Sequence, residues 1–385
     1  MSWFTDEELR LDSFPVARER IFLAHAGVTI LPRCAADAMR DHVEAACLHH
    51  QEFGDVLRDV ARTRGVCAKA IGAHADEIAL LGPTSLGLSL FANGLDWKPG
   101  DELVCYRDDY PSNVYPWTAL ASRGVVIRHV QPESPGRITP DVVEAALTAR
   151  TKLVALASAH FLSGWRIDVD AIGRLLRSRG ILFSVDAIQT LGAGPFSVEN
   201  VDFLSADAHK WMLGPLAIGI VFVAKRNFEL CRPTLLGAWN VRSPDFIAQE
   251  EIVFEETARR YEPGVLNITG MYGMKASLEM LLAAGMGEVR SSILQTRDAL
   301  QHHLREMGFG FLSPDESEPL RSGILTCRHP AKDSAVLFSK LEEAGIVASL
   351  RSLRDGSQWI RFSPHYYNSL GEMDRVARVL GAVIA

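Results

Sequence analysis

Short apolar runs alternate with amphipathic stretches through the first two thirds of the chain. The runs are rich in Val, Ile and Leu, as is typical of strands that are covered on both faces. The candidate strands are Glu102–Tyr106, Val125–Val130, Leu153–Ala157, Ile181–Val185, Phe203–Ser205 and Ile218–Val223. Helical patterns lie between several of these runs. Alternation of this kind predicts an α/β fold, with a mainly parallel sheet and helices on both of its faces.

Two of the intervening helices carry clear signals at their ends. Thr139 is a good N-cap, and Pro140 after it suits the first helical position. The stretch from Asp168 to Arg177 has apolar residues at helical spacing, and Gly180 is expected to end that helix.

The last third of the chain has a different pattern, which predicts a compact α+β unit. Its expected elements are helices at 274–286 and 289–307, a strand at 323–327, a helix at 334–344, strands at 346–350 and 359–362, and a helix at 370–383. We therefore place a domain boundary near Asn267. The predicted division is an N-terminal segment, 1–20, a large domain, 21–267, and a small C-terminal domain, 268–385, with the N-terminal segment free to pack on either domain.

Composition is that of an ordinary globular protein. The chain has 385 residues, 48% of them hydrophobic and 23% charged, with a formal net charge of −7. The acidic balance argues against a nucleic-acid partner. Its six cysteines are scattered without a C-x-x-C pair, which is typical of reduced thiols in a reducing compartment.

No segment reads as a secretion signal or a membrane span. Met1 to Phe14 is acidic and lacks a long apolar run. The most apolar stretch, Gly214 to Ala224, is about half as long as the ~20 residues that a membrane helix needs. We expect no membrane partner and a cytoplasmic location.

An aspartate stands at the end of one predicted buried strand. Asp186 follows Phe183-Ser184-Val185, and ligands of open α/β sheets gather at the carboxyl ends of strands. A buried carboxylate is unfavourable unless a positive group meets it. Asp186 is therefore either a cap of the next helix or the partner of a bound cation.

A lysine follows the next predicted strand. Lys210 is flanked by Trp211, Met212 and Leu213. Such a lysine could extend its amine to water, but desolvation would lower its pKa and make the amine a nucleophile, as Schiff-base formation requires. An Asp and a Lys at the ends of successive strands are much more specific together than either is alone.

These residues belong to a longer pattern that resembles the class V aminotransferase family of fold-type I enzymes, which depend on pyridoxal 5′-phosphate (PLP). That family includes cysteine desulfurases, kynureninases and isopenicillin N epimerase-like enzymes. The matching blocks are Asp186-x-x-Gln189, Ser205-x-x-x-His209-Lys210-Trp211-x-x-Gly214-Pro215, Phe22 to Val28, Gly82-Pro83-Thr84-Ser85, Asp109 to Asn113 with Pro116-Trp117, and Trp359 to Asn368. The resemblance covers nearly the whole chain and implies a seven-stranded, mainly parallel sheet in the large domain.

The resemblance implies a role for each residue around the cofactor ring. Lys210 would hold PLP as a Schiff base and then act as the mobile acid and base. Asp186 would pair with the pyridine nitrogen, and Gln189 would bond the ring hydroxyl. Tyr110 would stack on the ring, although it could also be an ordinary loop tyrosine, and Phe161 is expected among the cofactor-binding residues.

The phosphate is expected at the start of a helix. Thr84 and Ser85 lie between a predicted strand, Ile78–Leu81, and a helical run, so their hydroxyls and the helix N-terminus could cradle an anion. Thr-Ser is also an ordinary N-cap. His209 would add a donor to the phosphate.

The substrate is expected beside the cofactor. Arg361 would clamp the substrate carboxylate with its planar fork, unless it forms a surface salt bridge. The resemblance adds His25, Ala26 and Arg351 to the substrate side. Arg354 lies near the same entrance, and with Arg351 it hints at a second acidic group on the substrate.

Several positions depart from the family's pattern. Asp207 stands where desulfurases tend to carry a phosphate-binding Ser, so we expect it to orient His209 or to point away. Val265 replaces a Thr that reaches the neighbouring subunit's phosphate, and Ala24 stands where Asn is common. The stretch from Gly345 to Gln358 has no cysteine, although persulfide chemistry needs a mobile thiolate. Cys327, in a predicted core strand, is a poor substitute.

The pattern fixes the cofactor chemistry more closely than the reaction. There is no dinucleotide-binding or P-loop motif and no set of ligands at metal-site spacing. We favour a lyase that breaks a Cβ–S or other Cβ–X bond of an amino acid without a persulfide cysteine. An aminotransferase or an epimerase on the same scaffold, and a non-catalytic PLP-fold binding protein, remain open. The resemblance also implies a homodimer.

Overall fold

A seven-stranded sheet forms the centre of the computed structural model, which describes residues 6–52, 54–312 and 318–384. The strand order is β2-β8-β7-β6-β5-β3-β4. Only β8 runs antiparallel to its neighbours. The mainly parallel seven-stranded sheet is therefore confirmed. The strands are β2 Ile78–Leu80, β3 Glu102–Cys105, β4 Val126–His129, β5 Thr151–Ala157, β6 Leu182–Asp186, β7 Phe203–Asp207 and β8 Gly219–Val223.

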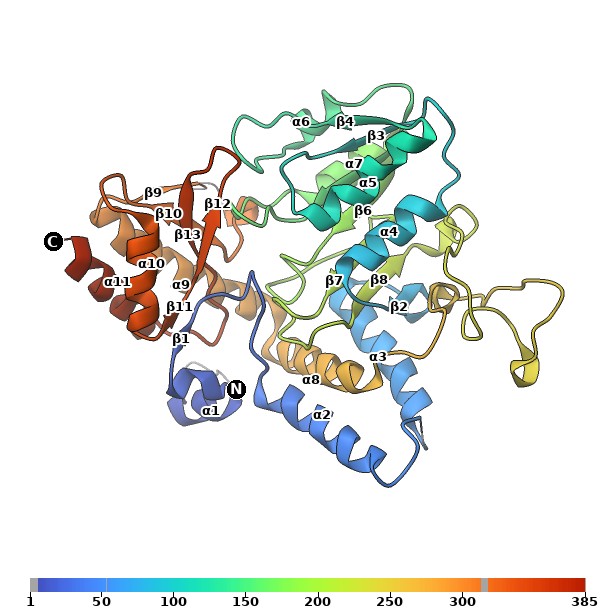
Figure 1. The fold of residues 1–385 in the computed structure, drawn as a ribbon, viewed down its shortest axis with the longest axis horizontal. Coiled ribbons are helices and arrows are strands. Elements are labelled where there is room, and N and C mark those ends of the chain that lie inside the picture. The colour runs from blue at the N-terminus through green and yellow to red at the C-terminus, as the bar shows by residue number, and fades with distance from the viewer. Residues whose placement is uncertain (1–5, 53, 313–317, 385) are drawn as a thin grey trace.

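Helices cover both faces of this sheet (Figure 1). Successive side chains of a strand point to opposite faces, so Val154 and Leu153 of β5 belong to two different apolar clusters. The cluster around Val154 includes residues of α3 Val56–Ile71, α6 Pro140–Glu144, α7 Val169–Ser178 and α8 Ile268–Ala284. The cluster around Leu153 includes residues of α4 Thr84–Gly94 and α5 Tyr115–Thr118.

The predicted N-terminal ends of two helices, α6 and α7, are confirmed, and that of α8 differs. The Thr139 side chain accepts a hydrogen bond from the Val142 N–H, and Asp168 accepts one from Ala171, so α6 and α7 begin where expected. The α8 helix begins at Ile268 rather than at Met274. Its N-cap is Asn267, whose side chain accepts a hydrogen bond from the Gly270 N–H at 2.9 Å.

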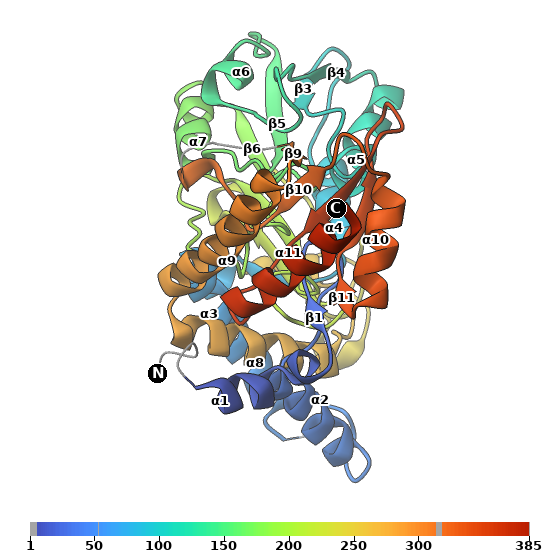
Figure 2. The ribbon, with the colours of Figure 1, turned by 90° about the vertical axis from the view of Figure 1, so that its left-hand side faces the viewer.

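A second, four-stranded antiparallel sheet and three helices form the C-terminal part (Figure 2). One predicted strand, 346–350, is wrong as a single element. It divides at Ala348 into two strands that belong to different sheets. The elements are α9 Met286–Glu306, β9 Gly310–Phe311, β10 Leu325–Arg328, α10 Ser334–Glu343, β11 Ile346–Val347, β12 Ser349–Ser352, β13 Gln358–Phe362 and α11 Leu370–Ile384.

The N-terminal segment packs on this C-terminal part. Its helix α1, Glu7–Ser13, is followed by Phe14, whose ring stacks on that of Tyr367 with a centroid distance of 4.0 Å. The short strand β1, Ile21–Phe22, pairs in parallel with β11. Residues 1–5 of the expected N-terminal segment lie outside the described residues, and the division at 20 and 267 stays a prediction.

Two features outside the sheets complete the fold. The helix α2, Arg33–Ala46, packs along α8, and the segment between β8 and α8 projects from the body of the molecule (Figure 1). Among the described residues, no helix combines the length and the apolar character that crossing a lipid bilayer requires.

Candidate active site

A cavity of about 440 Å³ lies at the carboxyl ends of β6 and β7. Asp186 is the last residue of β6, and Lys210 follows β7 after a short loop. Of the residues predicted for the site, all except His25 and Arg354 line this cavity. The lining residues are Ala26, Gly27, Val28, Pro83, Thr84, Ser85, Tyr110, Ser112, Phe161, Asp186, Ile188, Gln189, His209, Lys210, Arg351 and Arg361.

Asp186 presents a buried carboxylate to this cavity. Its side chain is held by the backbone N–H of Ile188, 3.0 Å from Oδ1, and the residue is only 2% exposed. Burial raises the pKa of Asp186 to about 6, while the Ile188 N–H and the nearby Lys210 oppose that rise. A cation placed in the cavity would therefore be strongly favoured by this carboxylate.

Lys210 brings an amine to the same cavity. The residue is 6% exposed, and burial lowers its pKa to about 8, against the opposing attraction of Asp186. Its Nζ lies 5.1 Å from the centre of the Tyr110 ring. At pH 7 about a tenth of this amine is uncharged, far more than at the ordinary pKa of lysine, and the uncharged form is the nucleophile that attacks a carbonyl.

Another part of the cavity lining has the features of an anion site. Pro83, Thr84 and Ser85 line it at the first turn of α4, where backbone N–H groups have no helical partner. The Thr84 Oγ1 accepts a hydrogen bond from the Asp207 N–H at 2.9 Å, which leaves its own proton available. His209 lines the cavity beside them.

Asp207 contacts His209 rather than the cavity, in agreement with the first of the two expectations for it. Its Oδ1 lies 2.7 Å from the His209 Nδ1, so the Nε2 atom of His209 is not used in this contact. Asp207 is 1% exposed, and its Oδ2 has no hydrogen-bond partner. The carboxylate therefore orients His209 from behind the anion site.

Two arginines on adjacent strands line the third part of the cavity. Arg361 of β13 is 1% exposed, and its Nη1 donates to the Phe161 carbonyl at 2.6 Å. Its Nε and Nη2 are buried without a partner. Burial, and then the positive charge of Arg351 on β12, lower the pKa of Arg361 to about 9. A buried guanidinium with free donors is a ready site for a carboxylate.

The two arginines approach the same backbone position. A Cβ added to Gly27 would lie 3.6 Å from an Nη2 atom of both Arg351 and Arg361. A larger residue at position 27 would therefore fill the space in front of both guanidinium groups.

Aromatic rings form one wall of the cavity. Tyr110 is 43% exposed, and its ring meets the edge of the Phe161 ring with a centroid distance of 5.5 Å. Because Tyr110 also lies over the amine of Lys210, its ring is placed where a ring bound at Lys210 could stack on it. Stacking by Tyr110 stays a prediction.

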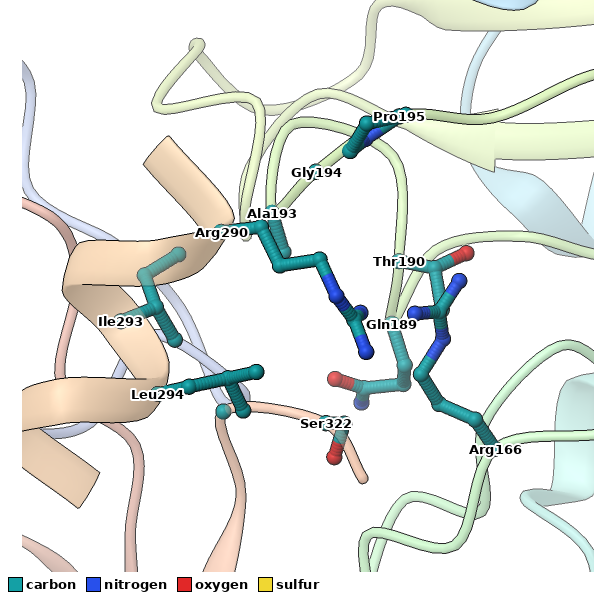
Figure 3. Close-up of a pocket in the computed structure, with 11 residues that line it drawn as sticks. Arg166, Gln189, Thr190, Ala193, Gly194, Pro195, Arg290, Ile293, Leu294 and Ser322 are labelled. Atoms are coloured by element: carbon teal, nitrogen blue, oxygen red, sulfur yellow. The ribbon is translucent and has the colours of Figure 1, made fainter. Parts of the chain in front are cut away.

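Gln189 lies between this cavity and a second, much smaller pocket. Its Nε2 donates to the Ala26 carbonyl at 3.1 Å, and its Oε1 accepts from the Trp211 indole N–H at 2.9 Å. Figure 3 shows the second pocket, where the Gln189 side chain lies near Arg166 and Arg290. One amide hydrogen of Gln189 remains for a ligand in the main cavity, as the predicted bond to a ring hydroxyl requires.

Two residues expected at the substrate side do not reach the cavity. His25 is fully buried, and its ring nitrogens lie 2.8 Å from the Ser363 carbonyl and 3.1 Å from the Tyr367 hydroxyl. Arg354 forms an ion pair with Asp108, with its Nε 2.6 Å from Oδ1. Arg351 is thus the arginine of the pair that lines the cavity, and a second acidic group on the substrate stays a prediction.

The sequence analysis assigned no role to one further carboxylate, Asp109. This residue belongs to the matching block from Asp109 to Asn113. It is 8% exposed, and burial, reinforced by Asp186, raises its pKa to about 7. Its position after the buried run Glu102–Tyr106 carries the same signal that identified Asp186.

The residues at this cavity fit PLP. The amine of Lys210 and the carboxylate of Asp186 face one space, which is also lined by the residues of the anion site and by Arg361 with its unpaired donors. That arrangement matches an aldehyde, a basic ring nitrogen, a phosphate and the carboxylate of an amino acid. In the part of the chain that the structure describes, no cluster of three or more His, Cys, Asp or Glu side chains could hold a metal ion.

Comparisons with known proteins place the chain among enzymes with this kind of site. The family model described as aminotransferase class-V matches residues 21–376. A probable cysteine desulfurase of Methanothermobacter thermautotrophicus is 26% identical and covers 99% of this chain and 98% of its own length. An uncharacterized aminotransferase, YcbU, of Bacillus subtilis is also 26% identical, over 94% and 93%.

Solved structures share the fold. The apo cysteine desulfurase of Thermococcus onnurineus superimposes with a TM-score of 0.90 at 22% identity, covering 100% of this chain and 99% of its own. The cystine C–S lyase C-DES, in complex with its product cysteine persulfide, superimposes with a TM-score of 0.86 at 22% identity, over 95% and 99%. Both likenesses describe the fold of the whole chain.

Proposed function

Because this chain belongs to the class-V aminotransferase family of PLP-dependent enzymes, we propose that it is a C–S lyase acting on a sulfur-containing amino acid. The observation that carries this proposal is one cavity lined by Lys210, Asp186 and Arg361, with no cysteine among the described residues that line it. Relatives named as cysteine desulfurases support a substrate with a C–S bond. The missing thiol argues for direct release of the sulfur compound.

None of the six cysteines is suited to carry sulfur at this cavity. Cys67, Cys105, Cys231 and Cys327 are buried, and burial raises the pKa of each thiol to about 12 or higher. Cys34 and Cys47 are more accessible but do not line the cavity. The hairpin loop between β12 and β13 contains no cysteine. An enzyme thiolate is therefore not at hand to attack the substrate sulfur.

The residues of the cavity have separate tasks in such a reaction. When bound, PLP supplies an electron sink for the bonds that break at the substrate. Asp186 would favour the protonated ring nitrogen by its charge. Lys210 would take the Cα proton and return a proton to the departing sulfur, since a pKa of about 8 suits both directions near neutral pH.

The two arginines specify the substrate. Arg361 would bind the α-carboxylate, because its Nε and Nη2 are the buried donors without a partner. Arg351 would bind a second carboxylate. Cystine carries two carboxylates and a C–S bond, so it fits both guanidinium groups. With one water molecule consumed, its elimination yields pyruvate, ammonia and thiocysteine, with no net oxidation.

The test is a product assay with L-cystine and L-cysteine as substrates. Release of pyruvate and ammonia in equal amounts supports the lyase. Formation of alanine, with loss of activity in Cys34→Ser or Cys47→Ser, would instead establish a desulfurase. Conversion of the cofactor to its amine form would establish an aminotransferase, racemised substrate an epimerase, and absence of any bound cofactor a binding protein.

Substitution of Arg351 tests the substrate assignment. Arg351→Ala should raise KM for cystine by about 10- to 100-fold, because a charged hydrogen bond contributes about 1.5–3 kcal/mol. The same change should alter KM for cysteine, which has one carboxylate, by less than about threefold. Equal effects on both substrates would remove the second carboxylate from the proposal. Lys210→Ala is the inactive control.

We also infer a homodimer. The projecting segment between β8 and α8 exposes apolar side chains, with Phe246 79% and Ile247 63% accessible, and Val265 is 69% accessible. Exposed apolar groups of this size are typical of protein contacts. Sedimentation of the native protein and of Phe246→Ser with Ile247→Ser would test this, since the double variant should sediment as a monomer.

A further inference from the structure

Asp109 occupies a buried position just behind the cavity, without lining it. Its two carboxylate oxygens accept three N–H hydrogen bonds. Oδ1 accepts from the Tyr110 backbone at 2.7 Å, and Oδ2 accepts from the Ala157 backbone at 3.2 Å and from the Asn113 side chain at 3.0 Å. Since every partner is a donor, these contacts favour the ionised form of the carboxyl group.

These contacts connect three segments that border the cavity. Tyr110 is the residue whose ring lies over the Lys210 amine. Ala157 is the last residue of β5 and stands opposite Asp186 in the ladder between β5 and β6. Asn113 in turn accepts a hydrogen bond from the Trp117 indole N–H at 2.9 Å, so the loop is anchored in the core beyond the cavity.

The same position brings two buried carboxyl groups close together. The charge of Asp186 is, after burial, the main cause that raises the pKa of Asp109. The other titratable groups that interact with Asp109 are Cys105 and Tyr106, and burial raises the pKa of both, which keeps them neutral near pH 8. Because its pKa is raised to about 7, Asp109 is ionised above neutral pH, and it then adds a second negative charge close to Asp186.

We propose that Asp109 is a positioning residue of the cofactor site, which fixes Tyr110 over Lys210 and adds a second buried negative charge behind Asp186. Both effects act on a bound ring: one on its stacking, the other on the stability of its cationic form. The proposal rests on PLP binding at Lys210 and not on which reaction follows.

A purely structural role is the competing explanation, because a buried aspartate that caps a loop also stabilises the fold. Asp202 provides a control in the same sheet. It accepts hydrogen bonds from the Phe183 backbone at 2.9 Å and from the Asn227 side chain at 2.8 Å, and it also pairs with Arg226 at 2.7 Å, but it precedes β7 and does not line the cavity. Asp202→Asn should therefore affect stability without affecting the cofactor.

The experiment compares the PLP-bound wild type with Asp109→Asn, Asp109→Ala and Asp202→Asn. The readouts are the affinity for PLP, from equilibrium dialysis, and the pH midpoint of the visible absorbance change of the bound cofactor. Loss of a nearby buried charge should lower that midpoint by about one pH unit and weaken PLP binding by about 10-fold in Asp109→Asn. Asp202→Asn should change neither readout.

The outcomes separate the two explanations. The proposal is overturned if Asp109→Asn leaves the pH midpoint of the absorbance change unshifted and the affinity for PLP within about twofold of the wild type. This holds even if the variant protein is less stable. Should Asp109→Ala fail to fold, Asp109→Asn, which keeps the size of the side chain, still decides. Because both readouts concern binding, a failure of the proposed lyase reaction would leave this test intact.

Discussion

Replacing Arg361 by methionine should stabilise the cofactor-free protein while abolishing substrate binding. The guanidinium is 1% exposed, only its Nη1 has a protein partner, and Arg351 adds a like charge nearby. Methionine has a similar length and no charge. The substitution therefore removes an uncompensated buried cation and leaves an apolar side chain in its place.

The magnitude follows from the pKa of Arg361, which burial lowers from the ordinary value of an arginine to about 9. A base with a lowered pKa binds its proton less tightly in the folded than in the unfolded state. At pH 7 the whole difference opposes folding, and at ~1.4 kcal/mol per pH unit it amounts to about 5 kcal/mol. Loss of the bond to the Phe161 carbonyl and of packing offsets roughly 2–3 kcal/mol of it. We expect a net gain of about 2 kcal/mol.

Arg297→Met is the matched control, because Arg297 is equally buried but well paired. Its Nη1 lies 2.7 Å from both Asp298 Oδ1 and Gln301 Oε1. Removing it takes away a buried guanidinium that is hydrogen-bonded to two side-chain oxygens, so the free energy of unfolding should fall by about 3 kcal/mol. Urea unfolding of both cofactor-free variants at pH 7 measures the two effects. A loss of stability in Arg361→Met as large as in Arg297→Met would refute the reasoning.

Two further predictions concern pH. The rate at which cofactor-free protein captures PLP covalently should rise with pH through a midpoint near 8, where Lys210 loses its proton. Borohydride reduction followed by mass spectrometry would measure this rate. A midpoint above 10 would contradict burial of the amine. Folding raises the pKa of Asp186 from 3.8 to about 6, so the stability of the wild type falls as the pH rises from about 4 to 6. Asp186→Asn removes this ionisation. The variant should therefore raise the free energy of unfolding of cofactor-free protein by at most ~3 kcal/mol at pH 8. Below pH 4 the gain should vanish, and a gain that persists there would have another cause.

The large sheet and the centre of the site could be predicted because their signals are local. Buried strands read as apolar runs, and a charged residue directly after such a run is conspicuous, as at Asp186. Parallel strands place their carboxyl ends at one edge, so Asp186 and Lys210 meet without any knowledge of their side-chain contacts. Thr84 at the start of a helix is again a local signal, but it is weak alone, and the expected phosphate site there depended on the family resemblance and stays a prediction.

Features that depend on partners distant in the sequence could not be predicted in this way. The apolar run at 346–350 gives no sign that it divides at Ala348, since the division arises from pairing of its first half with Ile21–Phe22. The sequence likewise does not tell that Arg354 meets Asp108, 246 positions away, whereas Arg351 faces the cavity. Surface arginines differ in role only through such tertiary partners.

The burial of three charged groups at the site becomes favourable only when a ligand is bound. Asp186, Lys210 and Arg361 are all buried, and burial shifts the pKa of each toward its neutral form. Each shift is unfavourable for the protein alone. A ligand with a ring cation, an aldehyde and a carboxylate relieves all three, so ligand binding should stabilise the fold beyond what its contact area suggests. The buried charges of the cavity thus lower the stability of the protein without ligand, as is usual for a functional site.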